Sequence, residues 1–147
     1  MAEHGFQVGL RLVDNYRFEV DFGECGALFA DQAPPLGGGD GPNPEQLLGA
    51  AVGNCLAASL LFAIRKFKDE PGAVTAAVSG ELERRDGRLR IAQLSVRLQL
   101  GNAAAAIPHL PRVLQQFEEF CTVTQSVRAG IPVQVTVVDG DGSVVAA

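Results

Sequence analysis

The sequence is poor in the residues that most often mark a catalytic centre. Its 147 residues include no tryptophan, one tyrosine and one methionine, and the two histidines, His4 and His109, are isolated. Neither histidine has a nucleophile context, so a Ser-His-Asp site finds no support. The three cysteines lack metal-ligand spacing and are too few for a disulfide framework. Of the reactive side chains, this leaves the thiols.

Positive charge is also scarce. Twelve Lys and Arg residues face 17 Asp and Glu residues, which gives a formal net charge of -5 at pH 7. Without a basic stripe to neutralise phosphates, nucleic acid is not expected as a partner. The N-terminal residues MAEHGFQVGL lack the basic start and apolar run of a signal peptide. We therefore expect a cytoplasmic protein with reduced cysteines.

The longest apolar segment, residues 44–67, predicts a central helix. Asn43 is a good N-cap, Pro44 suits the first helical position, and Glu45 complements the helix dipole. Basic residues follow near its end, and no charge lies between Gln46 and Ile64. A helix that is apolar all round is expected to be buried. Its length is close to a bilayer span of about 20 residues, but polar residues interrupt it and no second such stretch exists, so we expect a core helix and no membrane.

Gly49, Gly53 and Ala57 fall at a spacing of four in this helix. They form a ridge of small residues that lets another element approach closely. Either the ridge fits under a sheet, or the helix meets its own copy.

Strand patterns surround the helix. Residues 6–29 alternate in hydrophobicity and predict an antiparallel meander, with Arg17, Glu19 and Asp21 opposite the aromatic face. Residues 74–100 predict two long strands joined at Asp86-Gly87, with a phase slip near Ala92-Gln93 that indicates a β-bulge. A second helix starting at Pro108 or Pro111 and ending at Phe120, a short helix over 122–129 and a strand over 133–137 complete one α+β domain.

The Gly/Pro-rich loop at residues 31–44 precedes the central helix. No Lys-Ser/Thr pair follows its glycines and no dinucleotide spacing is met. The loop is therefore expected to be a connector and not a phosphate cradle.

Two of the three cysteines lie in or beside predicted helices. Cys55 lies in the apolar helix, where a thiol is most often a small core residue. Cys121 precedes the short helix, whose N-terminal field is expected to lower its pKa. Cys25 lies in a turn without an evident partner.

Two motifs together resemble a known family. NPEQLLGAAVGNCLA at residues 43–57 and EEFCTVTQSVRAGIPV at residues 118–133 are similar to the two cysteine segments of the OsmC/Ohr superfamily. The glycine loop, the Asp-Gly hairpin and the helix before Cys121 also fit. The resemblance extends over one OsmC-like domain, residues 1–147.

This resemblance implies an α+β fold with antiparallel sheets around a long buried central helix, in an intertwined homodimer. It implies a stress or detoxification protein that reduces organic hydroperoxides with thiols. Cys55 would attack the peroxide, Cys121 would resolve the product to a disulfide, and Glu45 would be the active-site carboxylate. An N-terminal arginine is also implied, with Arg17 the nearest candidate and Arg11 the alternative. No cofactor is implied beyond an external dithiol, such as a lipoylated protein.

Geometry adds a condition to this assignment. Glu45 and Cys55 lie ten residues apart in one helix, roughly 15 Å at 1.5 Å per residue. If both serve one site, Glu45 comes from the other subunit. We expect an apolar wall that favours alkyl hydroperoxides, formed by Leu56, Leu60, Phe117 and Phe120. The second function that stays open is a non-catalytic ligand-binding or redox-sensing protein of the same fold.

Overall fold

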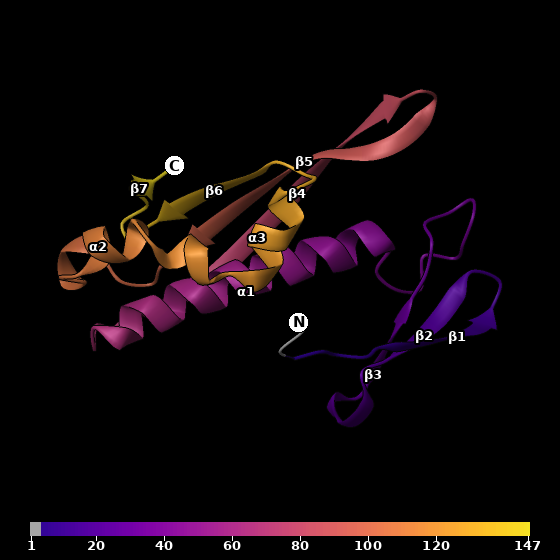
Figure 1. Ribbon diagram of the computed structural model, residues 1–147, viewed down its shortest axis with the longest axis horizontal. Helices are drawn as coiled ribbons and strands as arrows, with labels where there is room; N and C mark the ends of the chain where they lie inside the picture. Colours follow the sequence, from indigo (N-terminus) through magenta and orange to yellow (C-terminus); the bar gives the residue numbers. More distant parts are fainter. Residues whose placement is uncertain (1–3) are drawn as a thin grey trace. The chain divides into compact units, whose positions relative to one another are not determined.

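The computed structural model describes residues 4–147. The chain divides into two compact units, Met1–Leu48 and Gly49–Ala147, here called the N-terminal and C-terminal units. Helix α1 (Pro44–Lys66) begins in the first and continues through the second (Figure 1). Its bounds agree with the predicted helix to within one residue at its C-terminal end.

The N-terminal unit contains a three-stranded antiparallel sheet in the order β1-β2-β3. A turn with Asn15 at a φ of 47° joins the first two strands, a conformation that asparagine tolerates well. The predicted meander is confirmed. Its elements are β1 (Gly9–Asp14), β2 (Arg17–Asp21), the 3-10 turn η1 (Gly23–Cys25) and β3 (Ala27–Ala30).

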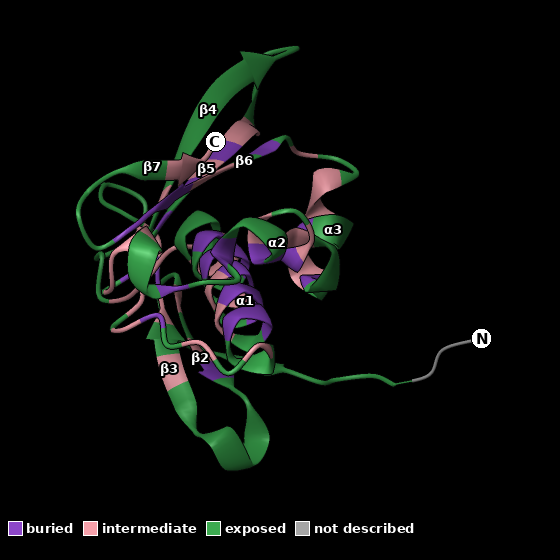
Figure 2. Cartoon of the chain, turned by 90° about the vertical axis from the view of Figure 1, so that its left-hand side faces the viewer, coloured by how far each residue is buried: buried purple, intermediate pink, exposed green. Residues whose placement is uncertain are grey.

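One face of this sheet is apolar and largely open. The register pairs Leu10 with Val20 and Leu12 with Phe18, which places all four side chains on one face. Val20 is buried, whereas Leu10 is 63% exposed and Leu12 is 55% exposed. In Figure 2 most of β2 and β3 is coloured as exposed or intermediate. A three-stranded sheet needs a covered apolar face for stability, and the unit itself supplies little of that cover.

A reciprocal capping box fixes the start of α1. The Gln46 N–H donates to Asn43 Oδ1 at 2.8 Å, and the Asn43 N–H donates to Gln46 Oε1 at 2.9 Å. Two otherwise free N–H groups are thereby satisfied. The cap confirms Asn43 as the N-cap residue.

The C-terminal unit contains a four-stranded sheet in the order β4-β5-β6-β7. Its strands are β4 (Thr75–Arg85), β5 (Arg88–Gln99), β6 (Val133–Val138) and β7 (Val144–Ala146). Asp86 and Gly87 both have positive φ, 52° and 76°, as a two-residue hairpin turn requires. Glu81 pairs with Gln93 and Leu82 with Ile91, so Ala92 is the extra residue of the predicted bulge.

One strand pair departs from the antiparallel expectation. β5 and β6 run parallel, with Leu94 opposite Val133. Parallel neighbours need a long crossover connection. Residues 100–132 provide it, through η2 (Ala104–Ala106), α2 (Leu110–Leu114), η3 (Phe117–Phe120) and α3 (Thr122–Arg128).

The prediction of a single helix ending at Phe120 is therefore wrong. It is divided into α2 and η3, with Gln115 and Gln116 between them. The apolar spacing continues across the break, and Val113 and Phe117 are both buried. Hydrophobic periodicity alone therefore could not reveal the break between α2 and η3.

The core of the C-terminal unit lies between α1, the sheet and the crossover. Val52, Leu56, Leu60 and Ile64 of α1 are fully buried. The opposite side of α1 is open, with Phe62 59% exposed, so the expectation of burial all round is wrong for the single chain. α1 is the one helix within residues 4–147 long and apolar enough to span a bilayer, and 44% of its most apolar window is buried inside the protein.

The small-residue ridge packs against the sheet. A Cβ atom on Gly53 would lie 2.6 Å from Cγ2 of Val78, and one on Gly49 would lie 3.5 Å from Cγ1 of the same residue. Of the two alternatives for the ridge, the structure therefore shows the fit under a sheet.

Candidate active site

Cys55 lies near the middle of α1, at the border between its buried and open sides. Leu56 beside it is fully buried, whereas Asn54 and Ala58 are exposed. The Cys55 side chain is half-buried. Its thiol belongs to a rigid helix and is still partly accessible.

Cys121 occupies the N-cap position of α3 and is fully buried. Its Sγ donates a hydrogen bond to Oγ1 of Thr124 at 2.9 Å. Thr124 is also fully buried, so this hydroxyl fixes the thiol from within the core. The sequence analysis missed Thr124, although its place three residues after an N-cap is where a side chain meets the capping residue.

The fold brings Cys55 and Cys121 together. Burial raises the pKa of Cys121, the neighbouring Cys55 thiol raises it further, and the bond to Thr124 opposes both effects. The expected lowering of this pKa by the helix N-terminus is therefore wrong. A thiol pays a desolvation penalty on ionising in the core, and the seven residues of α3 do not compensate for it.

This difference separates the two thiols chemically. Cys121 is buried, and its raised pKa favours the neutral thiol. Cys55 is the more accessible of the two. Cys25 is an exposed free thiol in η1 of the N-terminal unit.

The remaining predicted site residues belong to the N-terminal unit. Arg17 Nη1 lies 3.7 Å from Asp40 Oδ2, and its guanidinium lies 5.4 Å from the ring centroid of Phe29. Arg11 Nη2 lies 3.5 Å from Glu19 Oε1 at an exposed position. The side chain of Glu45, exposed in the first turn of α1, has no hydrogen bond or ion pair with any residue in 4–147. The two arginines thus differ, since Arg17 is half-buried and Arg11 is open.

The predicted apolar wall needs correction. Leu56, Leu60 and Phe117 are 0%, 0% and 1% exposed, so they belong to the core and not to a surface that receives substrate. Phe120 is 53% exposed and forms an edge-to-face pair with Phe62, with ring centroids 6.4 Å apart. Phe62 was not predicted, although it follows Cys55 by seven residues and so lies on the same face of the helix.

Comparison with known proteins identifies the chain. The family model of OsmC-like proteins matches residues 37–136. This protein belongs to the OsmC-like family. The match includes both cysteine segments, and a search of the curated proteins finds no match.

Solved structures share the fold over nearly the whole chain. An OsmC-like protein of unknown function from Vibrio cholerae has a TM-score of 0.73 at 20% identity, covering 94% of this chain and 100% of that one. The organic hydroperoxide resistance protein OhrB of Bacillus subtilis has a TM-score of 0.67 at 19% identity, covering 92% and 99%. A putative osmotic stress induced and detoxification response protein from Psychrobacter arcticus reaches 0.77 at 14% identity, covering 93% and 99%. At these identities the likeness establishes the α+β fold of the family.

Proposed function

We propose that this OsmC-like protein is a cytoplasmic thiol peroxidase that reduces organic hydroperoxides. The observation that carries the proposal is the pair of neighbouring thiols, one half-buried on α1 and one buried at the start of α3. Several structures of the same fold are named organic hydroperoxide resistance proteins, which supports the same chemistry.

The proposed reaction uses each thiol once. The Cys55 thiolate attacks the terminal peroxide oxygen, the O–O bond breaks, and the alkoxide takes a proton to leave as the alcohol. Cys55 is then a sulfenic acid, and the Cys121 sulfur attacks it, with loss of water and formation of a disulfide. An external dithiol, such as that of a lipoylated protein, reduces this disulfide by exchange and is itself oxidised. The two electrons thus pass from the dithiol to the peroxide without a bound cofactor.

Arg17 is proposed as the cation that favours the Cys55 thiolate, with Glu45 as an active-site carboxylate. A thiol in apolar surroundings becomes a useful nucleophile only when a positive group offsets its desolvation. Arg17 suits this role better than Arg11 because its side chain is half-buried and held on two sides. The same guanidinium would stabilise the negative charge that develops on the departing oxygen.

The acting unit is proposed to be a homodimer of one-domain chains. Two apolar surfaces of the single chain support this: the open face of the N-terminal sheet and the open side of α1 with Phe62. Large exposed apolar patches mark interfaces in soluble proteins. In a dimer, Glu45 of one subunit would serve the thiols of the other, which resolves the 15 Å separation expected along one helix.

The test is peroxide consumption by reduced protein with reduced lipoate or dithiothreitol as the dithiol. Cumene and tert-butyl hydroperoxides should be reduced faster than hydrogen peroxide. Cys55→Ser should lose turnover. Cys121→Ser should consume one equivalent of peroxide and then stall, or depend on an external thiol to reduce its sulfenic acid. Cys25→Ser is the matched control and should retain activity.

Disulfide mapping provides a second readout. After one equivalent of cumene hydroperoxide, the dominant bridge should join Cys55 and Cys121. A wild-type protein, confirmed as reduced and dimeric, that leaves both organic hydroperoxides intact would disprove the peroxidase proposal. The ligand-binding function would then take its place.

A further inference from the structure

The Gly/Pro-rich loop before α1 is built around one buried carboxylate, Asp31, which is 4% exposed. Its Oδ1 accepts the Gln32 N–H at 2.7 Å, and its Oδ2 accepts the N–H groups of Gly38 at 3.3 Å and Asp40 at 3.1 Å. The bond from the Asp40 backbone is the main cause that lowers the pKa of Asp31, and the charge of Arg17 lowers it further. The sequence suggested only a connector here, but the loop has a fixed internal structure.

Close packing around Asp31 explains the glycines of this loop. A Cβ atom on Gly37 would lie 2.3 Å from the Gln32 carbonyl oxygen and 2.5 Å from Asp31 Oδ1. Gly39 adopts a φ of 70°, which favours glycine. Substituting either residue would force the loop away from the carboxylate, so the glycines serve the position of Asp40.

Asp40 is the residue through which this loop reaches Arg17. Its backbone is bound to Asp31, and its carboxylate lies 3.7 Å from the Arg17 guanidinium. Phe29 lies across that guanidinium at 5.4 Å, a favourable cation–π geometry. Arg17 Nε is buried and has no partner among residues 4–147. A guanidinium carries five N–H donors, so Arg17 keeps donors for a further group while its position is set.

We propose that Asp40 is a positioning residue for Arg17, and that Asp31 acts one step behind it by fixing the Asp40 backbone. The inference rests on the proposed function, in which Arg17 activates Cys55. The resemblance assigns a carboxylate role to Glu45. Within residues 4–147, however, Asp40 lies beside the Arg17 guanidinium and the charge of Arg17 acts on Asp31, whereas no ion pair joins Glu45 to Arg17. The loop thus supplies an anchor for the arginine from its own unit.

The direction in which the pKa of the Cys55 thiol changes when Asp40 is removed distinguishes a positioning role from a direct charge effect. If Asp40 acted on Cys55 only through its negative charge, its removal would make the surroundings more positive and lower the pKa of the thiol. If Asp40 instead holds Arg17 in place, its removal lets the cation move away and raises that pKa. The two roles therefore shift the same quantity in opposite directions.

The test measures the pH dependence of Cys55 alkylation by iodoacetamide in the full-length, reduced Cys25→Ser protein, with mass spectrometry to assign the site. Arg17→Ala should move the midpoint to higher pH. Asp40→Asn should move it in the same direction, and Asp40→Glu should restore most of the original value. The double variant Arg17→Ala/Asp40→Asn should match Arg17→Ala alone, because a misplaced arginine and a missing one are equivalent.

Asp31→Asn should give a smaller shift of the same sign, and exposed Glu24→Gln, in η1 of the same unit, is the control expected to give none. If Asp31→Asn fails to fold, the Asp40 variants still test whether Asp40 positions Arg17. A midpoint that is unchanged or falls in Asp40→Asn, an unchanged midpoint in Arg17→Ala, or additive shifts in the double variant would each overturn the proposal. Because alkylation requires no peroxide, this outcome is independent of whether the wild-type protein turns over hydroperoxides.

Discussion

The two units of this chain differ in how they use their apolar side chains. Apart from Val20, every buried hydrophobic residue within 4–147 belongs to the C-terminal unit. The N-terminal sheet has a comparable apolar pattern but leaves Leu10 and Leu12 more than half exposed. The neighbouring thiols thus belong to the unit with its own core, and Arg17 belongs to the unit that lacks one. The fold of one chain thus positions the proposed nucleophile, Cys55, whereas the proposed cation, Arg17, lies on a sheet whose apolar face is largely exposed.

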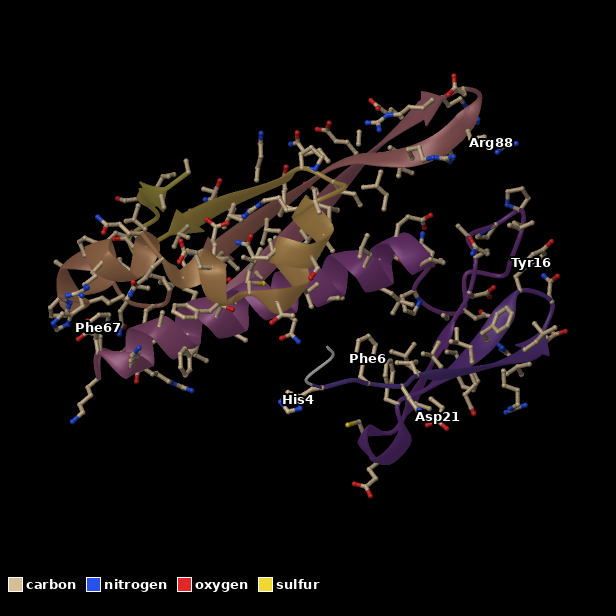
Figure 3. The ribbon with its side chains drawn as sticks, viewed as in Figure 1. His4, Phe6, Tyr16, Asp21, Phe67 and Arg88 are labelled. Carbon is tan, nitrogen blue, oxygen red and sulfur yellow. The ribbon has the colours of Figure 1, made fainter. Side chains whose placement is uncertain are left out.

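The largest effect expected from this contrast is on folding. Phe117 is 1% exposed in the C-terminal core, whereas Phe6, labelled in Figure 3, is 92% exposed in the N-terminal unit. The loss of stability on substitution by alanine should therefore differ sharply between the two positions. Phe117→Ala should lower the free energy of unfolding by about 3–5 kcal/mol, whereas Phe6→Ala should change it by less than about 0.5 kcal/mol. Urea titrations of both variants measure the difference. Similar losses in the two variants would mean that the N-terminal unit is covered in solution around Phe6 as well.

A second, smaller effect concerns the open sheet face. Leu10→Lys/Leu12→Lys places two charges on the apolar face, and a second subunit seated there would have to desolvate them. We expect a mass by light scattering that falls from dimer to monomer, with the C-terminal core still folded by circular dichroism. Arg11→Ala, on the opposite face of the same strand, is the matched control and should remain dimeric. Retention of the dimer by the double-lysine variant would place the interface elsewhere.

The sequence predicted best those features that local residues decide. The start of α1 was predictable because Asn43 and Gln46 satisfy each other within one turn, and the Asp86-Gly87 turn because its two residues tolerate positive φ. The parallel β5–β6 pair was not, since strand alternation is the same in either direction.

The candidate site shows the same difference between features that local residues decide and features that depend on distant parts of the chain. Both cysteine segments could be found in the sequence, but the pKa of Cys121 depends on burial by residues distant in the chain. Likewise, the contact between Arg17 and Asp40 spans residues that no local pattern connects. Burial and long-range pairing, and not composition, decide the surroundings of these side chains.

A third prediction uses the two thiols that differ most in burial. The pKa of Cys121 is raised in the folded protein, so the native state holds the proton more tightly than the unfolded chain. Its contribution to stability is complete below the unfolded pKa and is lost as pH rises through the folded pKa. Urea midpoints should therefore fall at alkaline pH, and fall less in Cys121→Ser. Cys25→Ser, which removes the exposed thiol of the other unit, should not alter the pH dependence, and an equal flattening in both variants would contradict the assignment.

The smallest expected effect compares two buried aspartates, one in each unit. Asp31 and Asp139 are each 4% exposed, and backbone N–H donors lower the pKa of both. A lowered carboxyl pKa adds stability at pH values above the unfolded-state pKa, and this stability is lost as pH falls through the folded-state pKa.

The two aspartates differ in what they connect. Asp139 accepts the Ala104 N–H at 2.8 Å and so connects the crossover to the turn after β6, whereas the hydrogen bonds of the Asp31 carboxylate stay within its own loop. Global unfolding by acid should accordingly depend less steeply on pH in Asp139→Asn, and change little in Asp31→Asn. In the latter variant, hydrogen exchange should accelerate at the Gly38 and Asp40 amides, and a loss of global stability as large as that in Asp139→Asn would show that the loop is coupled to the core.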